Sequence, residues 1–450
     1  MIVQTTWAKG RERLTGQVTG AAPAVLLQRH PLIFGALVVF FALYYYRPED
    51  FIPFLTYIPM ARIAGVIAFV ALLGAMMAGN VKVPKAVKIL WLLLLQMTIC
   101  IPFALWPGGA FHTVFDKYAK GVVVAMVISM AVVTTRELRK LLWIQVSAVA
   151  LVTLFSILAS HYKEGRLAGI QENILSGPND LAINIAISFP LGMAFMLYAR
   201  GFKKAIWVAA LGVMVLGVVL TASRSGLLAL IISIIVCVWE YGIKGKRRYL
   251  VVISIAAMLL GMAVALSSAH YRARVESIFV GNIEGSGDEG SIEARKNLLK
   301  KSVVTALKHP LFGVGPGCFP LVDDTWKVAH NAYTELAAEA GILALVLFLL
   351  ALGAAFKNIA QVRKSVEYRD NAELRLFTQA LWAGLAAYLT GSFFASTEYN
   401  LYPYFVVGYT CVMVRITSQL SRSDAQGSKP EILSKASYDR YLKPHALRTR

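Results

Sequence analysis

The chain has 450 residues, a mean hydropathy of +0.61 and only 16% charged residues. So much apolar surface cannot be buried in one aqueous core, which excludes a soluble globular protein and indicates that a bilayer acts as the solvent. The formal net charge of +20 would ordinarily suggest nucleic acid, but the Lys and Arg residues lie between the apolar runs. We therefore expect anionic membrane lipids, and no nucleic acid, as the partners of that charge.

Twelve apolar runs are roughly long enough to cross a bilayer, which takes about 17 to 25 residues. They lie near residues 24–46, 59–79, 87–106, 118–134, 141–160, 181–199, 205–221, 225–241, 249–267, 334–356, 376–395 and 400–417. The first thirty residues lack the short apolar core and cleavage site of a signal peptide, so the first helix is expected to direct insertion. The pattern predicts an all-α polytopic membrane protein of about twelve helices.

The basic residues predict the orientation of these helices. With both termini cytoplasmic, about 30 of the 45 Lys and Arg residues lie in inner segments, which matches the positive-inside bias. We expect a cytoplasmic N-terminal segment at 1–23, helices one to nine at 24–267, a large outer loop at 268–333, helices ten to twelve at 334–417 and a basic cytoplasmic tail at 418–450.

The outer loop at 268–333 is far longer than any other connection, which makes it the candidate for function. A Gly-rich stretch at 281–290 precedes a helical pattern from Ser291 to Lys308, with apolar residues on one face and lysines on the polar ones. We expect this segment to be a helix along the membrane surface. His309-Pro310 ends it, and a turn-rich segment leads to His330.

Arg224 lies in a short outer turn, Ser223-Arg224-Ser225-Gly226, against the positive-inside bias. One interpretation is an interfacial arginine that snorkels and caps the preceding helix. The other is a guanidinium that binds two phosphate oxygens at once. Arg295, on the predicted surface helix, and Arg166, in an earlier outer loop, allow the same functional reading, and a solvated surface is the alternative.

His330 stands directly before helix ten, at the expected outer boundary between water and lipid. A neutral imidazole there could accept a proton from a sugar hydroxyl or donate a hydrogen bond to phosphate, whereas the plain alternative is a capping or interfacial histidine. Glu335 and Glu339 follow four residues apart in the first turns of the helix, where carboxylates favour the positive end of the dipole. We expect them to be structural rather than catalytic.

Two acidic pairs on the outer side, Glu49-Asp50 and Asp323-Asp324, lack a matching His or carboxylate cluster at metal-ligand spacing. We interpret them as solvated acids and expect neither a metal nor another cofactor. The predicted spans carry almost no charge at mid-depth, where a transporter would need polar groups. The pattern favours chemistry at the outer membrane surface on a substrate anchored by a lipid.

Two motifs in and after the long loop resemble those of a known protein family. They are His309-Pro310 followed by Gly313, Gly315, Pro316 and Gly317, and His330-Asn331-x-Tyr333-x-Glu335 with a downstream Gly341. Together with the Ser223–Gly226 turn, with Arg295 ahead of His309 and with the single large loop between helices nine and ten, they make the chain similar to the O-antigen ligase and polymerase superfamily. In sequence the resemblance is concentrated between about 166 and 341.

The resemblance implies a metal-independent, inverting glycosyltransferase of lipopolysaccharide biosynthesis in the bacterial inner membrane. It would move a glycan from undecaprenyl diphosphate to lipid A-core at the periplasmic face. His330, Arg224 and Arg295 would be catalytic, with His330 as base or as a residue that positions substrate. Arg224, Arg295 and Arg166 would bind the donor diphosphate. Asn331, Tyr333 and Glu335 would support the site.

Three activities share the motifs of this superfamily: the ligase, the O-antigen polymerase and the protein O-oligosaccharyltransferase. The stretch Arg47-Pro48-Glu49-Asp50 also resembles a branch of O-glycosylation ligases, which leaves the acceptor open. A lipid or polysaccharide transporter is the alternative from another class of protein.

Overall fold

The computed structural model describes residues 30–50, 53–78, 82–163, 165–169, 177–247, 292–322 and 326–425. These residues are almost entirely helical, apart from one antiparallel pair of two-residue strands, β1 (Tyr162–Lys163) and β2 (Arg166–Leu167). The predicted all-α polytopic membrane fold is confirmed.

Long apolar helices occupy eleven of the twelve predicted runs within the described part of the chain. They are α2 (Pro31–Tyr46), α3 (Met60–Met77), α4 (Lys85–Cys100), α6 (Ala119–Ala131), α7 (Thr135–Leu158), α8 (Pro178–Tyr198), α9 (Phe202–Leu220), α10 (Arg224–Cys237), α14 (Ala332–Arg363), α16 (Ala372–Ser392) and α17 (Tyr402–Ala425). Seven of the described helices are long and apolar enough to cross a membrane. The run predicted at 249–267, the segment 1–23 and the stretch 281–290 lie outside the described residues, as does the tail beyond 425.

Shorter elements connect these helices. They are η1 (Pro48–Asp50), η2 (Pro53–Tyr57), η3 (Ile101–Phe103), α5 (Pro107–His112), the π-helical turns η4 (Thr113–Tyr118) and η5 (Val238–Ile243), α13 (Ile292–Lys308), η7 (Phe319–Leu321) and α15 (Val366–Asp370). The helix predicted from Ser291 to Lys308 is therefore present as α13. The last helix, α17, continues past residue 417, where the apolar run ends.

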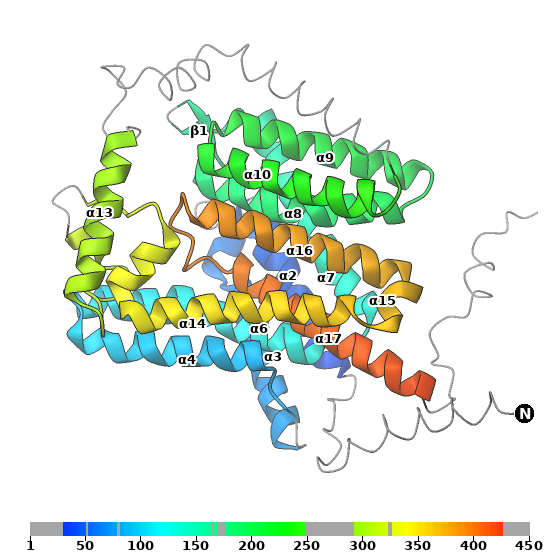
Figure 1. Ribbon diagram of the computed structural model, residues 1–450, viewed down its shortest axis with the longest axis horizontal. Coiled ribbons are helices and arrows are strands. Elements are labelled where there is room, and N and C mark those ends of the chain that lie inside the picture. Colours follow the sequence, from blue (N-terminus) through cyan, green and yellow to red (C-terminus); the bar gives the residue numbers. More distant parts are fainter. Residues whose placement is uncertain are drawn as a thin grey trace, which may run out of the picture.

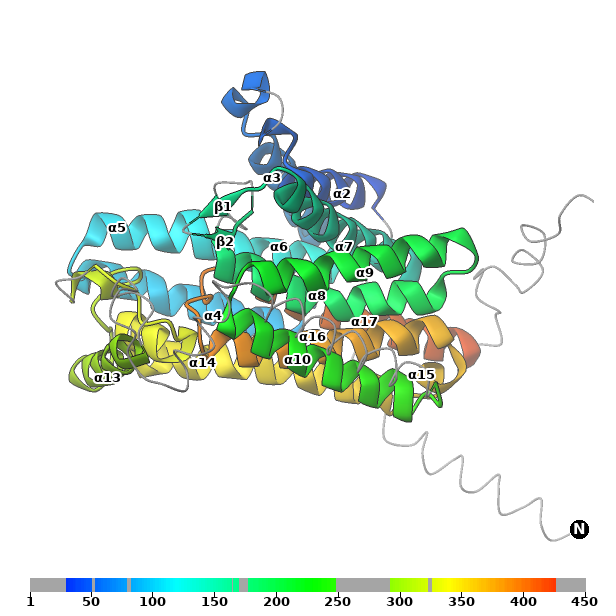
Figure 2. The ribbon, with the colours of Figure 1, turned by 90° about the horizontal axis from the view of Figure 1, so that it is seen from above.

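The long helices run roughly alongside one another in a bundle (Figure 1). The innermost is α8, with 89% of its apolar span buried, and it packs against α7, α9, α10 and α16. By contrast α3 is only 17% buried and packs chiefly against α2, and the two helices extend from one side of the bundle (Figure 2). The apolar exposed face of α3 is what a lipid-facing helix requires.

Helix α14 is interrupted at Gly341, which has φ 84° and ψ 169°. A side chain is excluded there, because a Cβ would lie 2.4 Å from the Leu311 carbonyl oxygen. The Gln96 side chain on α4 donates to the carbonyls of Leu311 (2.9 Å) and Ala340 (3.1 Å) beside this break. The predicted tenth helix thus consists of two pieces, and the first piece, residues 332–340, belongs to the site described below.

Candidate active site

One end of the bundle brings together the predicted site residues from distant parts of the chain. Helix α13, the β1–β2 pair, the start of α10 and the start of α14 all lie at this end (Figure 1). The connection between α16 and α17 contributes residues 393–401 to it. The site is thus assembled from segments that the topology returns to one end of the bundle.

His330 has a left-handed backbone conformation (φ 54°), which non-glycine residues seldom adopt. Both neighbours of His330 are fixed by hydrogen bonds. The Ala329 N–H donates to Glu335 Oε2 (3.0 Å), and Asn331 caps α14 by accepting from the N–H groups of Tyr333 and Thr334 (both 3.0 Å). The His330 backbone is therefore held in place from both sides.

The Asn331 and Tyr333 side chains anchor this segment to the end of α16. Asn331 donates to the Phe393 carbonyl (3.0 Å), and the Tyr333 hydroxyl donates to the Leu389 carbonyl (3.0 Å). Of the three residues predicted to support the site, Asn331 and Glu335 bind backbone on either side of His330, and Tyr333 binds α16. These contacts fix the backbone of residues 329–334.

His330 lies among positive charges. Burial, together with the charges of Arg295, Arg166 and Lys327, lowers the pKa of His330 to about 4. The imidazole is therefore neutral near pH 7 and has a lone pair that can accept a proton or a hydrogen bond. The structure thus brings Arg295, from α13, and Arg166, from β2, within electrostatic reach of His330.

Arg166 is tied into a polar network at the start of α8 and α10. Its Nε donates to the Thr221 carbonyl (3.0 Å) at the end of α9, and its Nη2 donates to Asn179 Oδ1 (2.7 Å). Asn179 Oδ1 also accepts from the Ser223 hydroxyl (2.8 Å), and Ser223 caps α10 by accepting from Gly226 N–H (3.2 Å). Arg166 thus binds the C-terminal end of α9.

Arg224 is the first residue of α10 and follows Ser223 directly. The turn that carries it is therefore joined, through Ser223 and Asn179, to Arg166. This network places the Arg224 backbone at the same end of the bundle as His330.

Arg295 is positioned by the packing of α13. Leu298 and Ala306 are buried against Phe319, Ala329, Ala337 and Ala338, and the Ser302 hydroxyl donates to Thr334 (2.8 Å). The opposite face exposes the apolar side chains of Val303 and Leu307. One face of α13 thus covers the His330 segment and the other is free to lie on lipid.

Three carboxyl groups, those of Glu335, Glu339 and Glu398, are almost fully buried behind His330. Glu335 also accepts from the Ser396 hydroxyl, and Glu339 accepts from the N–H groups of Gly317 (2.8 Å) and Phe319 (2.9 Å) and from the Tyr399 hydroxyl. Burial, reinforced by the charges of Glu335 and Glu339, raises the pKa of Glu398 well above its usual range. Glu335 and Glu339 thus hold the two loops of the site in place.

The loop from His309 to Phe319 needs its glycines. Gly313, Gly315 and Gly317 all have positive φ, and a Cβ on Gly313 would lie 2.2 Å from the Glu339 backbone. This close approach lets Val314 and Gly315 donate to the carbonyls of Ala338 and Glu339 (both 2.9 Å). The first motif of the sequence is thus packed onto the second.

Sequence reasoning missed three residues of this site: Lys327, Asn179 and Glu398. Lys327 had a usable signal, since it is a further outer cation that runs against the positive-inside bias close to His330. Asn179 and Glu398 act through contacts that only the fold creates.

Of the two acidic pairs in the sequence, the structure describes only Glu49-Asp50. The Glu49 carboxylate lies 3.7 Å from Arg47 Nε, whereas Asp323 and Asp324 are outside the described residues. Among the residues that the structure describes, no three or more His, Cys, Asp and Glu side chains are grouped to hold a metal ion. All four cysteines are buried and free.

Residues 209–349 match the family described as O-antigen ligase. The matched segment runs from α9 into α14 and includes Arg224, Arg295 and His330, while Arg166 precedes it. No curated protein matches the chain significantly.

Proposed function

We propose that the chain, whose residues 209–349 match the O-antigen ligase family, belongs to the O-antigen ligase and polymerase superfamily and is an O-antigen ligase. It moves a glycan from undecaprenyl diphosphate to lipid A-core at the periplasmic face of the inner membrane, without a metal or cofactor. The observation that carries this proposal is a neutral, backbone-anchored His330 among the positive charges of Arg295, Arg166 and Lys327. A neutral base surrounded by cations suits the transfer of a sugar away from a diphosphate.

The leaving group determines what the site must supply. When the bond between the anomeric carbon and the diphosphate oxygen breaks, the electron pair stays with the diphosphate and negative charge grows there. Fixed guanidinium groups stabilise that charge in the transition state more than in the ground state. Arg295 and Arg166 supply guanidinium groups beside His330, and Arg224 adds a third from the turn linked to Arg166.

The attacking group needs a base. As the acceptor hydroxyl oxygen bonds to the anomeric carbon, its proton passes to a nitrogen of the neutral His330 imidazole. A single displacement of this kind inverts the anomeric configuration. Glu335 and Asn331 act indirectly, because they hold the backbone on either side of His330.

The test is transfer in vitro from undecaprenyl diphosphate-linked glycan to purified lipid A-core, with EDTA present. Wild type is expected to form covalent product, and His330→Ala to be slower by about 10²- to 10⁴-fold, the usual contribution of a general base. His112→Ala is the matched control, because its imidazole is 68% exposed on α5.

Three other results would change the proposal. Product formed only on a second donor molecule or on a protein would identify a polymerase or a protein O-oligosaccharyltransferase. Movement of the donor lipid without a covalent product would identify a transporter. Full activity of folded His330→Ala would remove the imidazole from the mechanism.

A further inference from the structure

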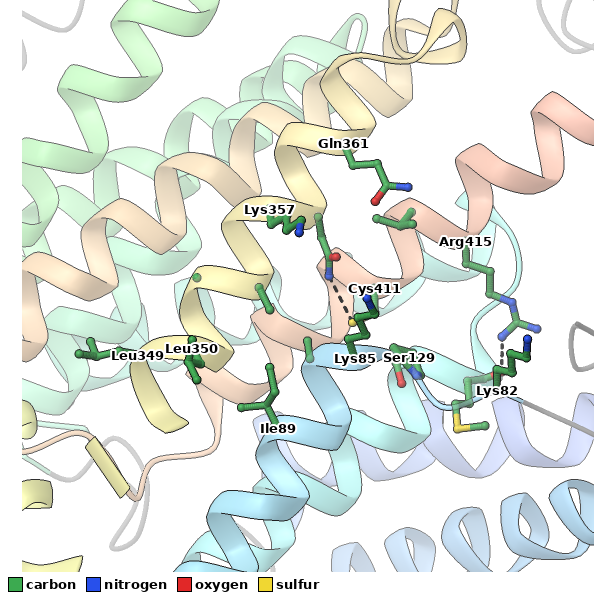
Figure 3. Close-up of a pocket in the computed structure, with 17 residues that line it drawn as sticks. Lys82, Lys85, Ile89, Ser129, Leu349, Leu350, Lys357, Gln361, Cys411 and Arg415 are labelled. Atoms are coloured by element: carbon green, nitrogen blue, oxygen red, sulfur yellow. Dashed lines mark hydrogen bonds between the residues drawn. The ribbon is translucent and has the colours of Figure 1, made fainter. Parts of the chain in front are cut away.

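A cavity of about 670 Å³ is drawn in Figure 3. It lies where α4 begins and α6 ends, towards the end of the bundle opposite the candidate active site. Its wall is built from four helices: the start of α4, the end of α6, the second half of α14 and the middle of α17. Cavities of this size are typical of sites for small molecules. The activity proposed above does not use this cavity.

The cavity is strongly cationic. Lys82, Lys85, Lys357 and Arg415 line it, and none of its seventeen described lining residues is acidic. The first turn of α4 adds the positive end of a helix dipole, since it begins in the cavity wall at Lys85 and holds no acid. Four like charges in one cavity repel one another, and a bound anion would relieve this repulsion.

Of these four cations, Arg415 has partners within the protein itself. It donates to the Met130 carbonyl (2.5 Å), and the buried Glu137 carboxylate acts on it electrostatically. The three lysines have no such carboxylate in the cavity wall. They are therefore the residues that an anionic ligand would engage.

A second basic pocket nearby shows the contrasting arrangement. It holds Lys244, Arg247 and Arg363, but it also contains Glu240, whose Oε1 lies 3.2 Å from Lys244 and 3.1 Å from Arg363. There the protein provides its own counter-ion. Among the described residues that line the cavity of Figure 3, no acidic side chain plays this part for Lys82, Lys85 and Lys357.

The remainder of the cavity wall is largely apolar. Ile89 faces it from α4, and Leu349 and Leu350 contribute from α14 while remaining 45% and 52% exposed. These leucines continue the exposed apolar surface of α14, formed by Ile342, Leu343 and Val346, which faces lipid in a membrane. A ligand here meets cations at one end and hydrocarbon at the other.

We propose that this cavity binds an anionic phospholipid. Its phosphate lies among Lys82, Lys85 and Lys357, and its acyl chains follow Ile89, Leu349 and Leu350. The positive-inside bias assigns this end to the cytoplasmic leaflet, where anionic lipids are available. The bound lipid joins α4 to α14, which are the same two helices that Gln96 joins near the active site.

The experiment measures lipid binding by native mass spectrometry and thermal unfolding of the full chain. Phosphatidylglycerol, phosphatidylcholine and inorganic phosphate are titrated separately. Wild type is expected to bind phosphatidylglycerol best, and Lys85→Gln/Lys357→Gln to bind it at least about tenfold more weakly, because two charge-assisted contacts are lost. Lys203→Gln/Lys204→Gln is the matched control, since it removes the same charge from exposed positions at the same end of the bundle.

A second variant tests the cavity without altering charge. Gly353 lines it on α14, and a Cβ there meets no atom within 4 Å, so Gly353→Leu should fold and fill the space. Loss of phosphatidylglycerol binding in both cavity variants, with the control unchanged, supports the proposal.

Other outcomes would overturn it. Equal weakening by the control pair would show a diffuse charge effect, and equal binding of phosphatidylcholine would show no selectivity for an anion. Stabilisation by inorganic phosphate as strong as that by phosphatidylglycerol would identify a site for a free anion.

Discussion

At the scale of single residues, His330 combines burial with a cationic surrounding, and both lower its pKa, to about 4 in the free protein. A donor diphosphate would neutralise the nearby arginines and thereby raise the pKa of His330. We therefore expect kcat/KM, which reports the free enzyme, to fall only as the pH drops towards about 4. The fall in kcat, which reports the donor complex, should come at a higher pH. Steady-state rates between acidic and neutral pH would measure both.

The lowered pKa of His330 also makes the stability of the protein depend on pH. An unfolded-state histidine protonates near its ordinary pKa of about 6.5, while His330 in the native state stays neutral down to about 4. Between these pKa values the unfolded state binds more protons than the native state, so stability rises with pH across that window and is constant above it.

The kinetic prediction has two contrary outcomes. If kcat/KM fell at the ordinary histidine pKa, or if its pH dependence were unchanged in His330→Ala, the role of this imidazole would be contradicted.

Arg224 and Arg295 provide a second prediction at this scale. We expect Arg224→Lys and Arg295→Lys to lose transfer while remaining folded in the membrane, because lysine keeps the charge but cannot bind two phosphate oxygens with one planar group. Arg62→Lys is the control, because Arg62 is an exposed arginine in the first turn of α3. Transfer assays on equal amounts of folded protein measure the effect, and near-normal rates in both variants would remove the arginines from diphosphate binding.

At the scale of elements, the interruption of α14 decides how the two motifs meet. Gly341→Ala should lower the free energy of unfolding by about 3 kcal/mol or more, because alanine is strained at this positive φ and its Cβ approaches the Leu311 carbonyl oxygen. Gly212→Ala on α9 is the matched control, with no atom within 4 Å of the added Cβ. Thermal unfolding in detergent compares the two, and equal melting temperatures would show that the break tolerates a side chain.

The sequence predicted the elements better than their interruptions. Apolar run length determines where a helix can span, so α4, α7 and α8 were predictable from composition alone. The break in α14 depends on Gln96 and the loop near Leu311, which lie far away in sequence. The local sequence pattern of a helix does not predict contacts with residues that are distant in sequence.

The candidate site shows the same division. The sequence singled out His330, Arg166 and Arg295 as polar residues on the expected outer side of the membrane, and their roles in the reaction stay predictions. Their grouping, and the part that Lys327 plays in it, depended on how α13 and β2 pack beside α14.

At the scale of the whole molecule, the two ends of the bundle have different chemistry. One end holds neutral His330 with fixed arginines over buried carboxyl groups. The other has cationic pockets among the helix ends. Such an asymmetry suits an enzyme whose substrates arrive from one leaflet only, and it makes the orientation in the membrane the property on which the proposed function depends.

That orientation can be measured with single cysteines. Trp326 is 71% exposed near His330, and Lys204 is exposed at the other end, while the four native cysteines are buried and should react slowly. In intact spheroplasts, a membrane-impermeant maleimide should label Trp326→Cys at once and Lys204→Cys only after the membrane is permeabilised. Wild type gives the background. The reverse pattern would place His330 in the cytoplasm, where a lipopolysaccharide acceptor at the periplasmic face could not reach it.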